Sequence, residues 1–225
     1  MTEFELRLKA ALSAARWLGT KEGSSGHRNL LAVYNGIRPL PRGYAMGEND
    51  PWCAAFASAS AVMAGVGELL PVECSCSRII EKARDMGIWV EDDSHIPDLG
   101  DWILYNWDAS KTGDDCGKPD HVGVVIALED DGILVVEGNY DNAVRLRRVP
   151  VNGQPIRGFV CPRYHSLEKE EVMEIRTISD VPEYARATIE KLTADGSLRG
   201  IAPDNLGLTE ELIRILVILD RRGVL

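Results

Sequence analysis

Residues 50–67 read DPWCAAFASASAVMAGVG, and this stretch decides how the chain folds. From Cys53 to about Ala64 almost every side chain is small or apolar, which is typical of a helix buried on all sides. Asp50 is a suitable N-cap, and Pro51 fits the first helical position, where its missing N–H costs nothing. The sequence therefore predicts a central helix with Cys53 in its first turn.

Helices are predicted before this stretch and strands after it. Thr2 and Glu5 have capping-box spacing ahead of apolar residues at helical intervals. We expect three further helices, at about 3–18, 29–34 and 75–86. Beyond Gly87, short β-rich runs between turn residues predict an antiparallel meander with strands at 102–105, 121–128, 133–137, 144–148 and 157–160. This order predicts the α+β class, with the N-terminal helices packed on an antiparallel sheet.

The composition is that of a folded globular protein with an acidic balance. The chain has 225 residues, and 25 basic against 35 acidic side chains give a net charge of −10. Non-specific binding to nucleic acid or anionic lipid needs the opposite sign. The chain lacks an apolar run long enough to span a membrane, and its first residues do not resemble a signal peptide. We therefore expect no nucleic-acid partner, no membrane partner, and synthesis in a cytoplasm.

The C-terminal part differs in composition from the rest. Residues 166–180 are polar and acidic, and we interpret them as a linker after a first domain at 1–165. Residues 181–225 form a small all-helical module, with helices predicted at about 181–194 and 209–222. The second helix is richer in Leu, Ile and Val than an isolated unit can bury, which favours packing or a homodimer through these helices.

Cys53 is the candidate nucleophile among five cysteines. The odd number of cysteines, without an export signal, indicates free thiols rather than a disulfide framework. The N-terminus of a helix stabilises a thiolate, and the free N–H groups of the first turn can hold a developing oxyanion. An inert core cysteine is the alternative interpretation of this position.

A thiolate nucleophile needs a base, and His121 at the start of a strand is the candidate. In a hairpin with a three-residue loop at 129–131, His121 faces Asn139 and Glu137 faces Gly123, all on one face of the sheet. A three-residue loop one position later keeps these faces, whereas a two- or four-residue loop turns Glu137 to the other face. A catalytic role therefore predicts a loop of odd length, with Glu137 or Asn139 orienting the imidazole.

Several ordered motifs resemble one protein family. They are PWCAAFASASAV, GDWILYNW, DHVGVVIAL, VVEGNYDNAVRLRRV and IRGFVCPRY, spread over roughly residues 5–165. Together they are similar to the CHAP family of cysteine- and histidine-dependent amidohydrolases and peptidases. The resemblance implies a papain-like α+β fold with Cys53 as the nucleophile and His121 as the base. It also assigns Glu137 and Asn139 as the polar residues that orient the histidine.

The resemblance implies cleavage of an amide bond in bacterial peptidoglycan. The expected enzyme is an N-acetylmuramoyl-L-alanine amidase or a stem or cross-bridge endopeptidase of the phage endolysin type, acting on the wall after release from the host cytoplasm. One alternative is a papain-like thiol hydrolase for a non-wall amide, such as a toxin effector or processing peptidase. Another is an inactive wall-binding or scaffold protein. The C-terminal helices resemble a single S-layer-homology-type unit, which implies wall attachment as an alternative to dimerisation.

Further side chains are candidates for a substrate groove. Four aromatic residues could bind a sugar–peptide polymer, and an aspartate before the histidine could bind a cationic part of a stem peptide. These residues are Trp52, Trp102, Tyr105, Trp107 and Asp120. Packing in the core is the alternative for Trp52 and Trp102, and a solvated loop is the alternative for Asp120.

No metal or other cofactor is expected. Some CHAP lysins carry alternating aspartates of a calcium loop just before the cysteine, and residues 47–50 lack that pattern. Cys74 and Cys76, with Cys116 and His121, lack the matched ligand pairs of a zinc site.

Overall fold

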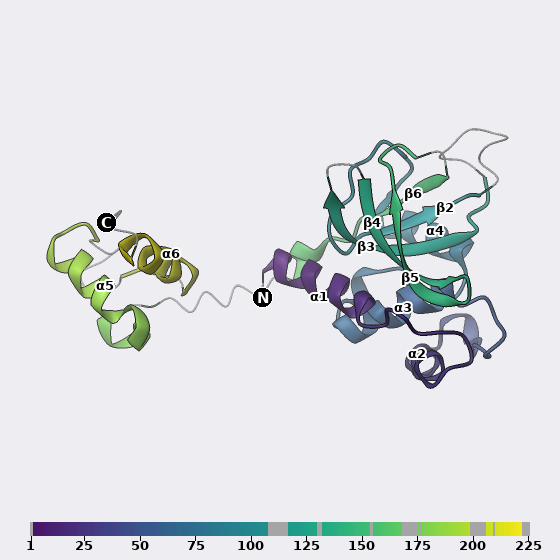
Figure 1. Cartoon of the computed structure of the whole chain (residues 1–225), viewed down its shortest axis with the longest axis horizontal. Helices are drawn as coiled ribbons and strands as arrows, with labels where there is room; N and C mark the ends of the chain where they lie inside the picture. Colours follow the sequence, from purple (N-terminus) through teal and green to yellow (C-terminus); the bar gives the residue numbers. More distant parts are fainter. Residues whose placement is uncertain are drawn as a thin grey trace. The chain divides into compact units, whose positions relative to one another are not determined.

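A computed structural model describes most of the chain. The described residues are 2–107, 117–129, 132–153, 155–167, 175, 177–198, 206–208 and 210–221. The chain divides into two compact units, Met1–Lys169 and Glu170–Leu225 (Figure 1). Four α-helices and an antiparallel six-stranded sheet in the first unit confirm the α+β class.

The first unit has four described α-helices, and the first two begin at side-chain caps. The four helices are α1 (Glu3–Ala15), α2 (Ser25–Asn35), α3 (Cys53–Ala64) and α4 (Cys76–Asp85). At α1 the Thr2 hydroxyl accepts from the Glu5 N–H, and the Glu5 carboxylate accepts from the Thr2 N–H, which completes the predicted capping box. At α2 the Ser24 side chain accepts from the backbone N–H of His27.

The sheet has strand order β1-β6-β2-β3-β4-β5, with all pairs antiparallel. The strands are β1 (Trp89–Val90), β2 (Trp102–Tyr105), β3 (His121–Glu129), β4 (Gly132–Tyr140), β5 (Ala143–Val149) and β6 (Ile156–Val160). Strands β2 to β5 form the predicted meander. The prediction for β6 is wrong, because this strand pairs with β2 and β1 instead of β5. All five residues of β6 are buried, which is consistent with its inner position between β1 and β2.

The β3–β4 hairpin corrects the predicted loop length. Glu129 pairs with Gly132, so two residues connect the strands instead of an odd number. A β-bulge at Ile126 then adds one residue to β3 and shifts the pairing beyond it. Gly123 consequently faces Glu137, the pairing that the odd-length loop was expected to give.

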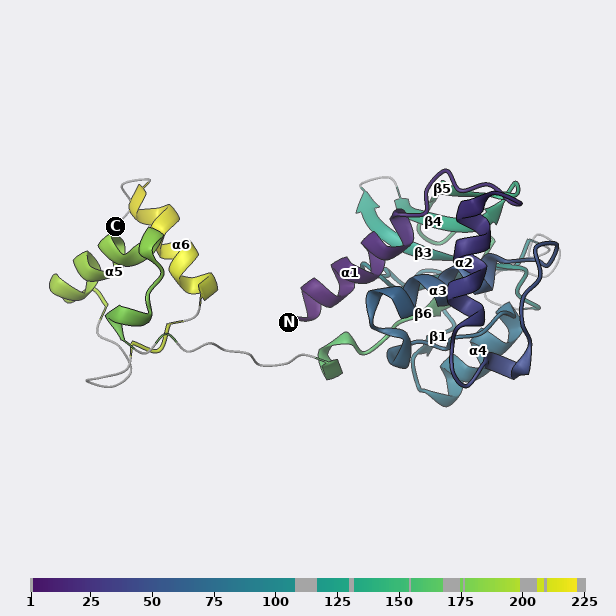
Figure 2. The ribbon, with the colours of Figure 1, turned by 90° about the horizontal axis from the view of Figure 1, so that it is seen from below.

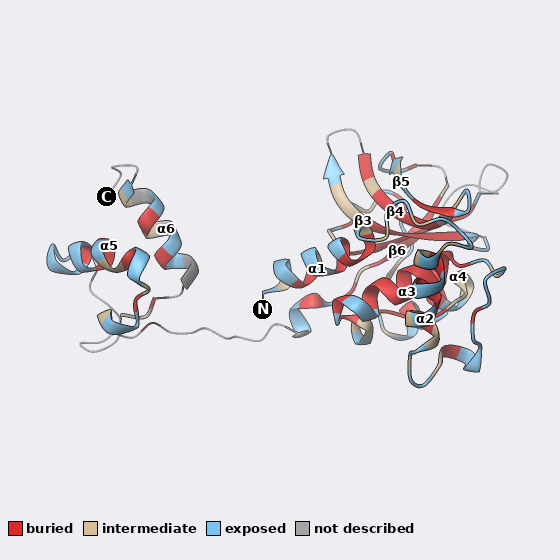
Figure 3. Cartoon of the chain, turned by 60° about the horizontal axis from the view of Figure 1, so that its bottom comes forward, coloured by how far each residue is buried: buried red, intermediate tan, exposed pale blue. Residues whose placement is uncertain are grey.

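The central helix α3 packs against α1 and α2 and against strands β3 and β4 (Figure 2). Ten of its 12 residues are buried, as predicted from its composition, and Figure 3 shows this helix almost wholly in the buried colour. The helix begins two residues later than predicted, because its N-cap is Trp52. Asp50 instead closes the preceding loop, where its carboxylate accepts from the Gly47 N–H at 2.7 Å and the Tyr44 hydroxyl at 3.0 Å.

Alternating side chains of the sheet enter two apolar clusters. The helix-side cluster contains Trp102, Val124 and Val136 together with most of α3. The second cluster contains Ile103, Val125, Ile133 and Phe159, which occupy the alternate positions of the same strands. The two faces therefore alternate regularly along β2, along β4 and along β3 as far as the bulge at Ile126.

The second unit is a small helical pair with its own apolar cluster. Its helices are α5 (Glu183–Ala194) and α6 (Glu210–Arg221). Ile189, Ile213 and Val217 are buried between them, and Asp220 accepts hydrogen bonds from the side chains of Thr188 and Lys191. Ile175 forms a β-bridge with Leu208 and joins this cluster, so part of the acidic stretch belongs to the unit. Among the described residues no helix is long and apolar enough to cross a bilayer.

Candidate active site

Cys53 is the first residue of α3, and the residue before it fixes the position of the helix start. The Trp52 side chain is fully buried, its indole N–H donates to Glu22 at 3.0 Å, and its ring packs on His27. The backbone N–H groups of the first helical turn have no partner within the helix. A thiol at this point therefore lies at the positive end of the helix dipole, and the Ala54 N–H of this turn is a hydrogen-bond partner of Cys53.

His121 and Glu137 form the contact predicted from the hairpin. The imidazole Nε2 lies 3.1 Å from Glu137 Oε2, which leaves Nδ1 for another partner. Glu137 is completely buried. The contact depends on the residue opposite Glu137, because a Cβ at Gly123 would lie 2.4 Å from Val135 and 2.8 Å from Glu137.

Arg147 is a site residue that the sequence pattern did not predict. Its Nε lies 2.8 and 2.9 Å from the two carboxylate oxygens of Glu137. The guanidinium also stacks over Tyr140, at 3.9 Å, and over Trp107, at 5.0 Å. Glu137 pairs with Arg145 across the β4–β5 ladder, so Arg147 is its diagonal neighbour on the same face. Pairing the predicted strand at 144–148 with β4 would have indicated this contact.

Asn139 has no contact with the imidazole among those described, whereas the Glu137 carboxylate lies within hydrogen-bond distance of it. The reason is local. The β4–β5 pairing is irregular between Glu137 and Tyr140, and Asn139 has a left-handed backbone with φ of 60°. The regular alternation that would place Asn139 opposite His121 ends there.

Three of the four predicted groove aromatics are core residues, which corrects that expectation. Trp52, Trp102 and Tyr105 are at most 1% exposed, so they cannot line an open groove. Tyr105 nonetheless supports the site, because it pairs with His121 across β2 and β3 and its ring lies 5.9 Å from the imidazole. Trp107 is 44% exposed and stacks on Tyr105 at 4.8 Å. It remains available to a ligand.

Asp120 lies beside this aromatic group and holds the end of β2. Its carboxylate accepts from the Trp107 N–H at 3.0 Å, and its own N–H donates to the Tyr105 carbonyl at 2.8 Å. Asp120 also lines the pocket described next. The aspartate is therefore both a structural brace and a pocket residue.

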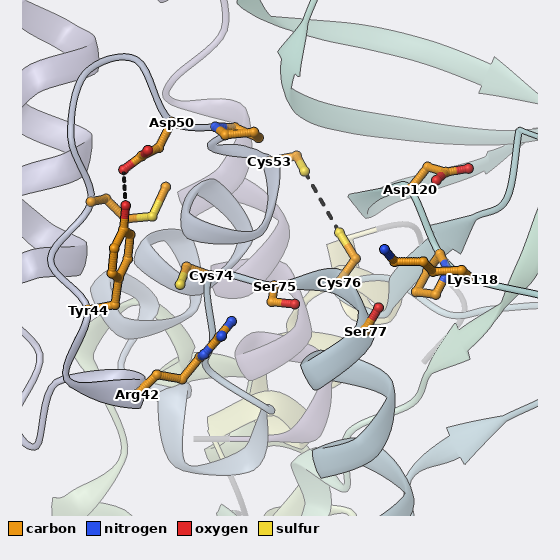
Figure 4. Close-up of a pocket in the computed structure, with 13 residues that line it drawn as sticks. Arg42, Tyr44, Asp50, Cys53, Cys74, Ser75, Cys76, Ser77, Lys118 and Asp120 are labelled. Carbon is orange, nitrogen blue, oxygen red and sulfur yellow. Dashed lines mark hydrogen bonds between the residues drawn. The ribbon is translucent and has the colours of Figure 1, made fainter.

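The Cys53 side chain opens into a pocket of about 480 Å³ (Figure 4). The lining joins the loop before α3, the start of α4 and the segment before β3. It includes cationic and anionic side chains together with three cysteines: Arg42, Lys118, Asp50, Asp120, Cys53, Cys74 and Cys76. The Cys76 sulfur lies 3.8 Å from that of Cys53.

The surroundings of Cys53 and His121 favour a thiolate–imidazolium pair. Hydrogen bonding from Cys76, then hydrogen bonding and charge from His121, hold the pKa of Cys53 well below its usual range, although burial opposes this shift. Burial disfavours the imidazolium, but Cys53 and Glu137 outweigh it and raise the pKa of His121 to about 9. The carboxylate stays ionised, because His121 and Arg147 overcome its burial and lower the pKa of Glu137.

Metal-ligand side chains come together at one place among the described residues. His95, Asp101 and Cys161 have ligand atoms within 4.8 Å of one another. The Asp101 carboxylate already accepts from Arg7 at 2.9 Å and from the Asp98 N–H at 2.9 Å. A cation there would sit beside the Arg7 guanidinium, so we interpret this cluster as a structural tie. Of the weak zinc pattern, Cys116 lies outside the described residues.

The third thiol of the pocket, that of Cys74, is hydrogen-bonded to the neighbouring residue in the sequence. The Cys74 thiol donates to Glu73 at 3.6 Å, and burial raises its pKa. Among the described cysteines, Cys53 is the one whose pKa is lowered.

Comparison with known proteins gives no independent indication of function. No family model matches the chain, and no curated protein or solved structure matches it significantly.

Proposed function

We propose that the first unit is a cysteine amidohydrolase or peptidase of the CHAP type that cleaves an amide bond in bacterial peptidoglycan. The observation that carries the proposal is a connected set of side chains: Cys53 lines the pocket, His121 interacts with its thiol, and Glu137 contacts the imidazole of His121. A thiol at a helix start, an imidazole beside it and a carboxylate on that imidazole are a nucleophile, a base and an orienting group. The choice of peptidoglycan and of a papain-like fold rests on the resemblance of the motifs.

The first half of the reaction forms a thioester. The Cys53 thiolate attacks the amide carbonyl carbon, and the negative charge moves to the carbonyl oxygen. Free N–H groups at the start of α3 stabilise this oxyanion. Protonated His121 gives its proton to the leaving nitrogen, the C–N bond breaks, and the amine departs.

The second half regenerates the thiolate. Neutral His121 removes a proton from a water molecule, and the resulting hydroxide attacks the thioester carbonyl. The C–S bond breaks, the carboxylic acid leaves, and His121 is again protonated beside the Cys53 thiolate. Glu137 holds Nε2 throughout, so Nδ1 is the nitrogen that exchanges protons.

The charges of the pocket suit a peptide that carries both charge signs. Arg42 and Lys118 offer positive charge, and Asp50 and Asp120 offer negative charge, around the thiol. Stem peptides of peptidoglycan carry both free carboxylates and amines. With a net charge of −10 the chain is repelled by anionic wall polymers, so a shaped pocket must supply the contact.

Substitution of the nucleophile tests this function. Cys53→Ala in the full chain should abolish clearing of a suspension of Gram-positive cell walls. The matched control is Cys161→Ser, which removes a thiol outside the pocket and should leave clearing intact. Retained clearing by Cys53→Ala would refute the assigned nucleophile.

Mass spectrometry of the digested wall defines the bond that is cut. Release of peptides with a new N-terminal alanine, together with free lactyl-muramic acid, identifies an amidase. New termini within the stem or cross-bridge identify an endopeptidase. Intact walls with a reactive Cys53 would instead favour a thiol hydrolase for another amide, and wall binding with an unreactive Cys53 would favour an inert scaffold.

A further inference from the structure

Two helices place their first residues, both cysteines, in contact at the pocket. Cys53 begins α3 and Cys76 begins α4, and their sulfur atoms lie 3.8 Å apart. Figure 4 shows the two side chains pointing toward each other across the pocket. Cys53 is 7% and Cys76 is 9% exposed, so the pair is shielded on most sides but reachable through the pocket.

The second thiol supports the Cys53 thiolate by its hydrogen bond but takes no part as a reactant in hydrolysis. Attack, protonation and hydrolysis require Cys53, His121, Glu137 and backbone donors, and Cys76 carries out none of these steps. A buried thiol facing a thiolate is, however, the arrangement that resolves an oxidised cysteine. The distance is compatible, since closing 3.8 Å to a disulfide bond of about 2.05 Å needs a movement of roughly 1.8 Å.

We propose that Cys53 and Cys76 form an oxidisable pair, in which a hydroperoxide converts the two thiols into an intramolecular disulfide that blocks the pocket nucleophile. The loss of activity rests on the proposed function of Cys53. The formation of the disulfide does not, because it depends only on the two thiols and the oxidant.

The chemistry balances in two steps. The Cys53 thiolate attacks the outer oxygen of hydrogen peroxide, the O–O bond breaks, and the hydroxide that leaves takes a proton from His121 to become water. Cys53 is now a sulfenic acid. Cys76 then loses its proton and attacks the Cys53 sulfur, the S–O bond breaks, and the departing hydroxide combines with a proton to give a second water. Two electrons have passed from the sulfurs to the peroxide.

Charge and burial assign the two thiols to different roles. The low pKa of Cys53 keeps it as the thiolate that reacts with peroxide. The pKa of Cys76 is raised, first by its hydrogen bond with Cys53 and then by burial, so Cys76 is the protonated partner that waits. Cys74 also lines the pocket, but its thiol is bonded to Glu73 and its sulfur has no described contact with Cys53.

The experiment oxidises the full chain with one equivalent of hydrogen peroxide and measures the intact mass. The expected product is lighter by two hydrogen atoms, and peptide mapping should join Cys53 to Cys76. A thiol reductant should restore the starting mass. Wall clearing should be lost on oxidation and recovered on reduction.

Two variants separate this pair from any other thiol. Cys76→Ser should form no internal disulfide and should gain oxygen atoms on Cys53, whereas Cys74→Ser should cross-link like the parent. Cys76→Ala provides the same test if the serine variant does not fold, as judged by circular dichroism. A Cys53–Cys74 bond, or a parent chain that gains oxygen without losing two hydrogens, would overturn the proposal. The mass measurement requires no substrate, so it tests formation of the disulfide independently of hydrolase activity.

Discussion

The substitution Glu137→Gln removes a single charge from the His121 contact while keeping the shape of the side chain. Glu137 is completely buried and lies 3.1 Å from the imidazole, so solvent does not screen this interaction. A hydrogen bond to a charged group contributes about 1.5–3 kcal/mol. One pKa unit corresponds to about 1.36 kcal/mol, so the pKa of His121 should fall by about one to two units from its value of about 9.

The same substitution should weaken the thiolate. An imidazole that loses its proton at lower pH supports less negative charge on Cys53 at neutral pH, and less still as the pH rises. The amide must also accept from Arg147, and only one of the two former carboxylate oxygens remains an acceptor. We therefore expect slower alkylation of Cys53 and slower clearing of cell walls at pH 7.

Two measurements check this expectation. Proton NMR follows the imidazole of His121 through its titration, and iodoacetamide labelling against pH follows the thiolate of Cys53. The matched control is Glu129→Gln, since Glu129 lies at the opposite end of β3, about 26 Å away by strand rise, and pairs with Arg148. An unchanged His121 titration in Glu137→Gln, or an equal shift in Glu129→Gln, would refute the account of the site.

Three further outcomes follow from the same geometry. Wall clearing should decline as pH rises through about 9, because His121 then lacks the proton that it gives to the leaving amine; a kcat/KM profile that stays flat through that range would contradict this role. Gly123→Ala should lower the free energy of unfolding by about 1–3 kcal/mol, because the new Cβ meets Val135 at 2.4 Å. Urea unfolding measures the change, and Gly47→Ala, where the nearest atom is at 3.5 Å, should change it much less. Arg147→Lys should slow wall clearing by about tenfold to a hundredfold, since losing one charged hydrogen bond costs roughly 1.5–3 kcal/mol. Initial clearing rates test this, and Arg148→Lys should retain the parent rate.

The pattern of apolar residues in the sequence predicted the fold well where a single pattern determined the structure of a segment. The all-round apolar character of α3 predicted its central position, and the alternation in β2 to β5 predicted their meander. Residue type alone did not distinguish a groove aromatic from a core aromatic, because Trp102 and Trp107 have the same chemistry. Their exposure depends on strand position: Trp102 lies within β2, whereas Trp107 lies two residues beyond its end.

Contacts between distant segments were beyond the sequence pattern. The contact of Cys76 with Cys53 spans 23 residues and depends on how α4 begins relative to α3. The spacing of apolar residues within either helix does not predict where the two helices begin relative to each other. Arg147 is an intermediate case, because the strand was predicted but its register with β4 was not. Once the register of β4 and β5 is assigned, a basic side chain on the same face of the sheet as the candidate catalytic carboxylate can be identified from the sequence.

The bulge at Ile126 connects the sequence pattern to the chemistry. With a two-residue loop and no bulge, regular pairing would set Val124 opposite Glu137, and His121 and Glu137 would lie on opposite faces. Val124 belongs to the helix-side apolar cluster. One of the two polar groups would then enter that cluster without a partner, at the cost of burying an unpaired polar or charged group. The extra residue in β3 avoids this cost, so the bulge is as necessary to the candidate site as the side chains that form it.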